Sequence, residues 1–169
     1  CPAQSLRNII HFASRNAMDI EGLGVAVATQ LVEKELVHSA ADIYTLTREQ
    51  LLTLDKFKEK SVENLLTAIR NSKQNNLDKL LFGFGIRNIG DKAAALLAEN
   101  FGTLQAIREA TPEQISQIDG FGGVMAQSVA EFFAKEGTTD LVHRLADAGV
   151  NMQWKGEPKG DKLAGKTLV

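Results

Sequence analysis

The sequence predicts an all-α protein in which four turn-and-helix units, arranged as a duplicated pair, form one compact helical domain. Apolar residues recur at helical spacing through most of the 169 residues, and glycine-rich turns separate the helical stretches. The turns also repeat at a nearly constant interval, which is typical of chains built from one supersecondary unit. Strand-like segments are expected only at 150–154 and 163–169.

The repeat consists of an apolar residue, any residue, a glycine, an apolar residue and a second glycine, followed by a helix. Its four copies begin at Ile20, Leu54, Ile86 and Ile118, and successive starts are 34, 32 and 32 residues apart. Segments 42–51 and 104–115 also match each other, and each contains a capping box ahead of the next turn. Units one and two are therefore predicted to be duplicated as units three and four. A solenoid of the tetratricopeptide type is the competing architecture, but such repeats do not need glycine at the turn that opens a helix.

In the first half, each helix is predicted from its apolar face and its terminal residues. An amphipathic helix should run to about Ser14, and a second should follow the first glycine turn and end at Glu35. Ser39 and Thr47 can each cap a short helix, because their hydroxyls accept hydrogen bonds from first-turn N–H groups. The best helix follows Lys58, and its buried positions at helical spacing are Val62, Leu65, Leu66 and Ile69.

The second half is predicted in the same way. The expected helices are 77–84, 91–100, 104–109, 112–117, the stretch after Gly122, and 139–148. Gly102 and Gly149 supply C-terminal caps, since glycine readily adopts the left-handed conformation that ends a helix. Thr111, Pro112 and Gln114 together form a helix start signal.

Composition and charge narrow the class of protein. No apolar run is long enough to span a bilayer, no signal peptide is present, and a single cysteine excludes an internal disulfide framework. The net charge is −2, but residues 55–92 carry eight basic and five acidic side chains, whereas 93–154 carry three and eight. Side-chain contacts to a polyanion should therefore centre on 55–92. Cys1 in place of an initial methionine suggests an internal fragment of a longer protein.

The stretch 85–90 shows what chemistry the turns offer. Gly85 and Gly90 can adopt backbone conformations closed to other residues, which leaves Arg87 and Asn88 at the tip. A turn that feeds a helix N-terminus gathers unpaired backbone N–H groups at the positive end of the helix dipole, where a phosphate can bind. One such stretch would fit an ordinary helical corner, but its recurrence in four copies favours phosphate binding.

This frame resembles the helix–hairpin–helix motif, in which a Gly-apolar-Gly hairpin presents backbone N–H groups to a DNA phosphate. The resemblance implies that paired hairpins hold phosphates across the minor groove of duplex DNA without reading its sequence. The candidate DNA-binding residues are Gly22, Gly24, Lys56, Lys58, Lys60, Arg87, Asn88, Gly90, Lys92, Gly120 and Gly122. The second copy has lysine in place of both glycines. It is either purely structural or reaches phosphates through the side chains of Lys56, Lys58 and Lys60.

The whole chain resembles the middle and C-terminal part of the bacterial NAD-dependent DNA ligases. Residues 1–4 resemble the end of that family's zinc finger, 17–24 with 30–34 and 84–90 resemble hairpins of its DNA-binding domain, and 163–169 resemble the first strand of its BRCT domain. We therefore expect a zinc-finger tail and connecting helix at 1–16, a helix–hairpin–helix domain at 17–154, a linker at 155–162 and a truncated BRCT start at 163–169.

That resemblance implies a parent enzyme that seals nicks in double-stranded DNA during replication and repair, with NAD as adenylate donor and with Mg²⁺ and Zn²⁺. The nucleophilic lysine would lie upstream. The fragment alone should therefore be inactive, with no catalytic or cofactor-binding residue of its own. We expect it to be a monomer that contacts no membrane and acts in the bacterial cytoplasm at the nucleoid. Cys1 would be one of four zinc ligands, and because the other three are absent no ordered zinc is expected.

The remaining candidate catalytic and metal-binding residues are weaker evidence of function. His11, His38 and His143 have no partners at metal-site or catalytic-triad spacing. Asp140 follows the fourth turn at a distance similar to that in helix–hairpin–helix DNA glycosylases, but those enzymes use one hairpin and a dedicated pocket. The alternative function is a helical protein-interaction scaffold of a DNA-repair protein, which the local charge of −5 in residues 93–154 favours.

Overall fold

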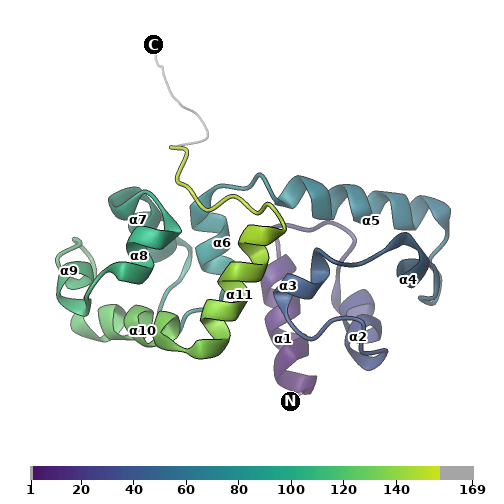
Figure 1. Cartoon of the computed structure of the whole chain (residues 1–169), viewed down its shortest axis with the longest axis horizontal. Coiled ribbons are helices and arrows are strands. Elements are labelled where there is room, and N and C mark those ends of the chain that lie inside the picture. Colours follow the sequence, from purple (N-terminus) through teal and green to yellow (C-terminus); the bar gives the residue numbers. More distant parts are fainter. Residues whose placement is uncertain (1, 157–169) are drawn as a thin grey trace, which may run out of the picture.

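The computed structural model describes residues 2–156, and every named element within them is a helix (Figure 1). The helices are α1 (Pro2–Ala13), α2 (Val25–Glu33), α3 (Ala40–Ile43), α4 (Arg48–Leu52), α5 (Glu59–Ser72), α6 (Leu77–Gly83), α7 (Asp91–Phe101), α8 (Leu104–Glu109), α9 (Pro112–Ser116), α10 (Gly123–Ala134) and α11 (Glu136–Asp147). An antiparallel bridge between Thr103 and Gln153 falls in the extended piece expected at 150–154. The expected zinc ligand Cys1, most of the linker and the BRCT-like stretch 163–169 lie outside the described residues.

The helices form two groups that share one buried core. In Figure 1, α1 to α5 lie on one side and α7 to α10 on the other, with α6 and α11 between them. The largest fully buried side chains come from both groups: Ile9, Phe12, Met18, Leu31, Ile43, Leu51, Leu65, Leu77, Leu80, Leu81, Leu97 and Leu104. Helix α1 packs against α2, α3 and α6, so it belongs to the same core. The predicted compact all-α fold is confirmed.

The start of α11 differs from the sequence prediction. The helix begins at Glu136 rather than at Thr139. Gly137 and the threonines that follow it are poor helix formers, so local preference alone does not favour the earlier start. Thr138 is only 6% exposed, and its packing into the junction outweighs that weak local preference.

Side chains tie the first group of helices to α6 and α11, which lie between the groups. The His11 ring nitrogen Nε2 lies 2.7 Å from the carbonyl oxygen of Phe82, joining α1 to α6. Arg144 on α11 forms an ion pair with Asp42 on α3. Burial alone would raise the pKa of Asp42, but hydrogen bonds from Arg144 and from the His38 and Ser39 amides outweigh burial and hold that pKa below 3.8.

Candidate nucleic-acid interface

The four predicted hairpins share one backbone geometry. The third residue of each frame has a positive φ: 95° at Gly22, 66° at Lys56, 69° at Asn88 and 93° at Gly120. In each frame the N–H of the fourth residue donates to the C=O of the first, at N···O distances of 3.2, 3.2, 3.1 and 2.9 Å in chain order. A positive φ at the third position is the mark of a type II β-turn. The geometry therefore persists in the two units that lack glycine at this position.

Each hairpin delivers the chain into a helix with an uncapped N-terminus. The N-cap residues Gly24, Lys58, Gly90 and Gly122 have extended backbone and no side-chain capping bond. Each N-cap carbonyl accepts the first helical bond from the residue four positions later, at 2.9 to 3.1 Å. The N–H groups of the first three helical residues have no backbone acceptor in the described chain. Four clusters of donors therefore lie at positive helix ends.

Three of the N-cap glycines are not needed by the fold. A Cβ added to Gly24, Gly90 or Gly122 would meet nothing within 4 Å. Their φ values, −90°, −90° and −94°, are open to any residue. Glycine at an exposed N-cap keeps the neighbouring amides accessible to a group that approaches from outside. Gly22 and Gly120 differ, because their positive φ values are costly for other residues.

The four helix starts are not equally free to bind an anion. Helices α2 and α10 have no acidic residue in their first turn. Helices α5 and α7 have Glu59 and Asp91 in their first turns, and a negative charge there competes with an incoming anion for the positive helix end. The Asp91 carboxylate also accepts a hydrogen bond from the Lys92 amide at 2.9 Å. The first and fourth hairpins therefore offer the freest amides, a distinction that the sequence frame did not reveal.

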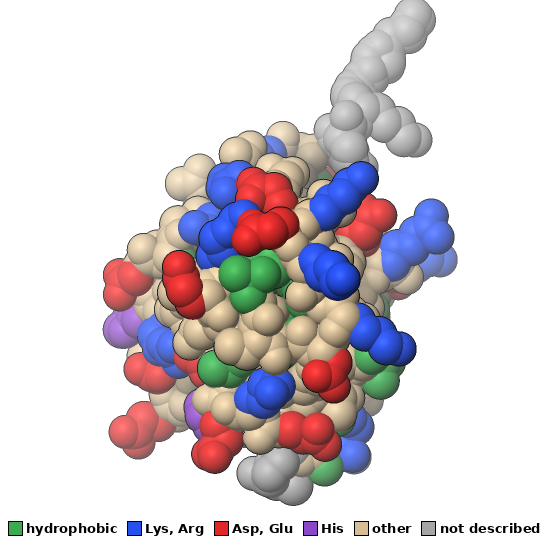
Figure 2. Space-filling model, turned by 90° about the vertical axis from the view of Figure 1, so that its right-hand side faces the viewer, with side chains coloured by type: hydrophobic (Ala, Val, Ile, Leu, Met, Phe, Trp, Pro, Cys, Tyr) green, Lys and Arg blue, Asp and Glu red, His purple; other side chains and the backbone are tan. Residues whose placement is uncertain are grey.

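The predicted basic side chains are exposed and available. Lys56, Lys58, Lys60, Arg87 and Lys92 all lie on the surface, and none forms an ion pair within residues 2–156. Figure 2 views the end of the molecule that carries α4 and the start of α5, and shows Lys and Arg interleaved with Asp and Glu. On this face the basic side chains therefore do not form one continuous positive patch.

Arg48 reduces the negative charge beside the second hairpin. Its guanidinium pairs with Glu59 and, at 3.0 Å, with Glu63 on the first turns of α5. Lys58 and Lys60 flank this acidic pair in the sequence. This partner for the two carboxylates lies on another helix, so the sequence frame did not identify it.

The hairpins pack in reciprocal pairs. The amide of Asp55 in the second hairpin donates to the Gln30 side chain on α2 at 2.7 Å, and a Cβ on Gly22 in the first hairpin would lie 3.7 Å from Leu65 on α5. In the second pair, the Asn88 side chain donates to Ser128 on α10 at 3.0 Å, and a Cβ on Gly120 would lie 3.7 Å from Leu96 on α7. Asn88 therefore has a packing role in addition to its predicted place at the turn.

Two further observations on the described part concern metal sites and membrane spans. No group of three metal-binding side chains occurs within residues 2–156. None of the helices described there is both long and apolar enough to cross a membrane. The Tyr44 hydroxyl lies 2.8 Å from the Ser72 hydroxyl, so this aromatic side chain has a partner inside the protein.

Comparisons with known proteins separate the same two pairs. The model of the SAM-like helix-hairpin-helix tandem matches residues 14–71, and the model of the helix-hairpin-helix motif matches residues 79–142. The DNA ligase of Oceanobacillus iheyensis is 48% identical over 174 residues, that of Bacillus cereus 49% over 175, and that of Bacillus licheniformis 48% over 175. Each alignment covers the whole of this chain. The chain is homologous to a segment of the bacterial DNA ligases. It spans 26% of the length of these curated relatives.

Proposed function

We propose that this chain is the duplex-DNA-binding module of an NAD-dependent DNA ligase, and that it binds without regard to sequence. The observation that carries the proposal is the repeated uncapped helix start behind one turn geometry, in a chain homologous to a segment of DNA ligases. Backbone amides and lysine or arginine side chains contact phosphate oxygens, which are the same for every base pair. Such contacts position a protein on DNA but cannot specify a base sequence.

The four hairpins contact DNA phosphates in two ways, through backbone amides and through charged side chains. The first and fourth hairpins, with no acid in the first helical turn, donate backbone N–H groups to phosphates across the minor groove. The second and third hairpins add the ammonium and guanidinium groups of Lys56, Lys58, Lys60, Arg87 and Lys92. Both kinds of contact hold the duplex around a nick while another part of the parent protein carries out the ligation.

The parent enzyme is proposed to use NAD, Mg²⁺ and Zn²⁺ as cofactors. It is proposed to act in the bacterial cytoplasm at the nucleoid. The described residues do not fit a zinc site, because they contain no group of three suitable ligands. No step of the proposed DNA contact depends on a metal or cofactor. The module is proposed to bind nicked double-stranded DNA as a monomer.

Duplex binding at several salt concentrations tests this function. Fluorescence anisotropy with labelled duplexes of unrelated sequence should give similar affinities. The logarithm of the binding constant should fall linearly with the logarithm of salt concentration, with a slope of about −0.9 per neutralised phosphate. The double variant Lys58→Gln/Lys60→Gln should lower the magnitude of that slope by about one to two. The matched control Lys34→Gln/Lys155→Gln removes two exposed lysines outside the hairpins and should leave the slope unchanged.

Two outcomes would contradict the proposal. An affinity that differs widely between unrelated duplexes would mean that the protein reads bases. An absence of duplex binding at low salt would favour the protein-interaction scaffold, for which the excess of acidic residues in 93–154 is the supporting feature.

A further inference from the structure

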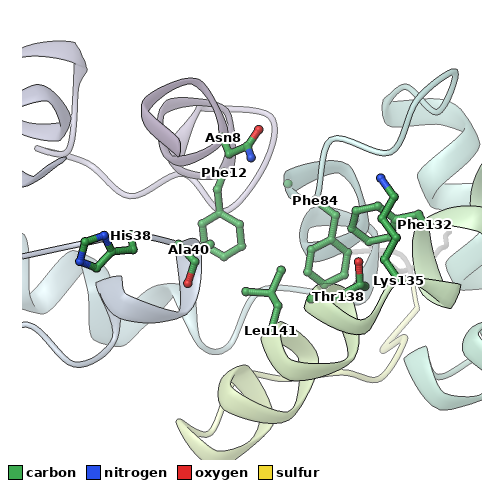
Figure 3. A pocket seen from close by; sticks show the side chains of 12 residues that line it. Asn8, Phe12, His38, Ala40, Phe84, Phe132, Lys135, Thr138 and Leu141 are labelled. Carbon is green, nitrogen blue, oxygen red and sulfur yellow. The ribbon is translucent and has the colours of Figure 1, made fainter. Parts of the chain in front are cut away.

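A cavity of about 320 Å³ lies at the junction between the two groups of helices (Figure 3). Phe12 of α1 and Leu141 of α11 line it, together with Phe84, which follows α6, and Phe132 of α10. The Phe84 and Phe132 rings have centroids 5.5 Å apart. The cavity therefore offers aromatic walls to a planar apolar group, which prefers offset or edge-on contact with such rings.

One buried polar group in this cavity lacks a partner. Thr138 is 6% exposed, yet its hydroxyl forms no hydrogen bond with any residue in the described range 2–156. Figure 3 shows the hydroxyl oxygen directed into the space between Phe84 and Lys135. Buried hydroxyl groups in folded proteins nearly always have a hydrogen-bond partner, since leaving one unsatisfied costs free energy. The hydroxyl therefore points to a polar atom supplied from outside the chain.

The same end of the cavity is electropositive. Helix α11 begins there, and its N-cap residue Lys135 makes no side-chain capping bond. A Cβ on Gly137, in the first turn, would meet nothing within 4 Å, so the helix start is open. Lys135 is exposed and forms no ion pair in the described part of the chain.

The acids nearest to Lys135 are not part of the lining of the cavity, although Glu131 lines an adjoining pocket together with Lys135. Glu136 is exposed in the first turn of α11, and Glu131 on α10 accepts a hydrogen bond from Gln127. Neither glutamate lines the cavity. Lys135 and the start of α11 are therefore the charged features that an occupant would meet.

We propose that this cavity binds a small aromatic monoanion. The aromatic ring lies between the phenylalanine side chains, and the anionic group accepts hydrogen bonds from the Thr138 hydroxyl, the Lys135 ammonium and the first amides of α11. The volume suits a ligand of one or two fused rings, since small-molecule sites start at about 300 Å³. The site is independent of the proposed DNA contacts, because neither Lys135 nor Thr138 belongs to a hairpin.

Amide chemical shifts of the ¹⁵N-labelled 169-residue chain test the site without DNA. Titration with 2-naphthoate should produce saturable shifts at Lys135, Gly137 and Thr138 and in the side chain of Asn8, which also lines the cavity. The neutral analogue 2-naphthamide and inorganic phosphate each lack one half of the recognised chemistry. Each should bind at least about tenfold more weakly than 2-naphthoate.

Variants then separate the two polar contacts. Lys135→Gln, at an exposed position, should weaken 2-naphthoate binding about tenfold. Thr138→Val keeps the side-chain shape and should weaken binding several-fold, whereas the remote Lys34→Gln should have no effect. Equal affinity for 2-naphthoate and 2-naphthamide, or no saturable shift with 2-naphthoate, would overturn the proposal. Unchanged binding by Lys135→Gln would do so as well.

Discussion

Lys56 shows that the hairpin geometry does not depend on glycine. Its φ is 66°, in the left-handed region, where an L-residue with a side chain pays about 1–2 kcal/mol. The sequence frame placed Lys56 at the position of a glycine, and that alignment correctly predicted a turn there. It could not show that the backbone would keep a glycine-like conformation, because that is imposed by the buried Leu54 and by the packing of the second hairpin on α2.

Replacing Lys56 should therefore change stability in a way that depends on the backbone. Lys56→Gly relieves the left-handed strain but adds chain entropy to the unfolded state, so we expect a net gain of about 0.5–1 kcal/mol. Lys56→Gln is the matched control, since it removes the same charge and keeps the strain. Urea denaturation measures both. If the two variants had the same free energy of unfolding, the left-handed strain would not be real.

Tyr44 makes a second prediction at the residue scale, and it is the only tyrosine in the chain. Burial raises the pKa of Tyr44 to about 12, and the hydrogen bond with Ser72 offsets this in part. Because the pKa of the folded state lies above the ordinary value of 10.0, this contribution to stability is complete below pH 10. It is lost as the pH rises from 10 towards 12.

The tyrosinate absorbance of the folded protein reports Tyr44 alone. Its titration midpoint should lie near 12, and the midpoint in strong denaturant should return to about 10. Tyr44→Phe should remove most of the alkaline loss of stability between these values. A folded-state midpoint at 10 would show that the hydroxyl is not buried as described.

At the scale of helices and turns, the sequence correctly predicted those helix starts that depend on hydrogen bonds between residues close together in the chain. The box predicted at Thr111 is present in both directions: the Gln114 amide donates to the Thr111 hydroxyl at 3.1 Å, and the Thr111 amide donates to the Gln114 side chain at 2.9 Å. The start of α11 was predicted three residues late. Thr138 in its first turn is buried beside residues of helices distant in the sequence, and local sequence signals contain no information on such contacts.

The ion pair between α3 and α11 leads to a prediction at the same scale. Arg144→Gln should lower the free energy of unfolding at pH 7 by at most about 1 kcal/mol, because the guanidinium is partly exposed. Arg144 holds the pKa of Asp42 below 3.8, so its contribution is present above that pH and is lost as the pH falls through the depressed value. The stability difference between wild type and variant should therefore shrink under acid.

Denaturation of both proteins at pH 7 and at about pH 2, below the depressed pKa of Asp42, measures that difference. Arg108→Gln is the matched control, since Arg108 bonds only to the neighbouring side chain of Gln105 among the described residues. This control should show no such dependence on pH. A difference for Arg144→Gln that stays constant down to pH 2 would mean that Asp42 is not its partner in solution.

At the scale of the whole molecule, the repeat predicted the duplicated units but not how they meet. The contacts of Asp55 with Gln30 and of Asn88 with Ser128 join each hairpin to the second helix of its paired unit. Nothing in the frame marks Gln30 or Ser128 as contact residues, because their roles exist only once the helices are packed. The cavity at the junction could not be predicted for the same reason: α1, α3, α10 and α11 all contribute to it.

The sequence frame predicted a set of candidate interface residues, but it did not predict how their surroundings differ. The frame identified the glycines of the first, third and fourth hairpins as equivalent. In three dimensions, Gly22 and Gly120 hold the turns, whereas Gly24, Gly90 and Gly122 leave open space in front of the helix amides. The central claim is that these amides, at α2 and α10 above all, bind the DNA.

The double variant Gly24→Ser/Gly122→Ser tests that claim most directly. Both positions have the extended backbone of a good N-cap, so each serine hydroxyl can bond the free amides and should stabilise the fold by a few tenths of a kcal/mol, about 0.3 per site. Urea denaturation and duplex-binding anisotropy are measured on the same samples. We predict unchanged or higher stability together with a loss of affinity of about tenfold or more, since the amides are then occupied. Equal stability with undiminished duplex affinity would contradict the account.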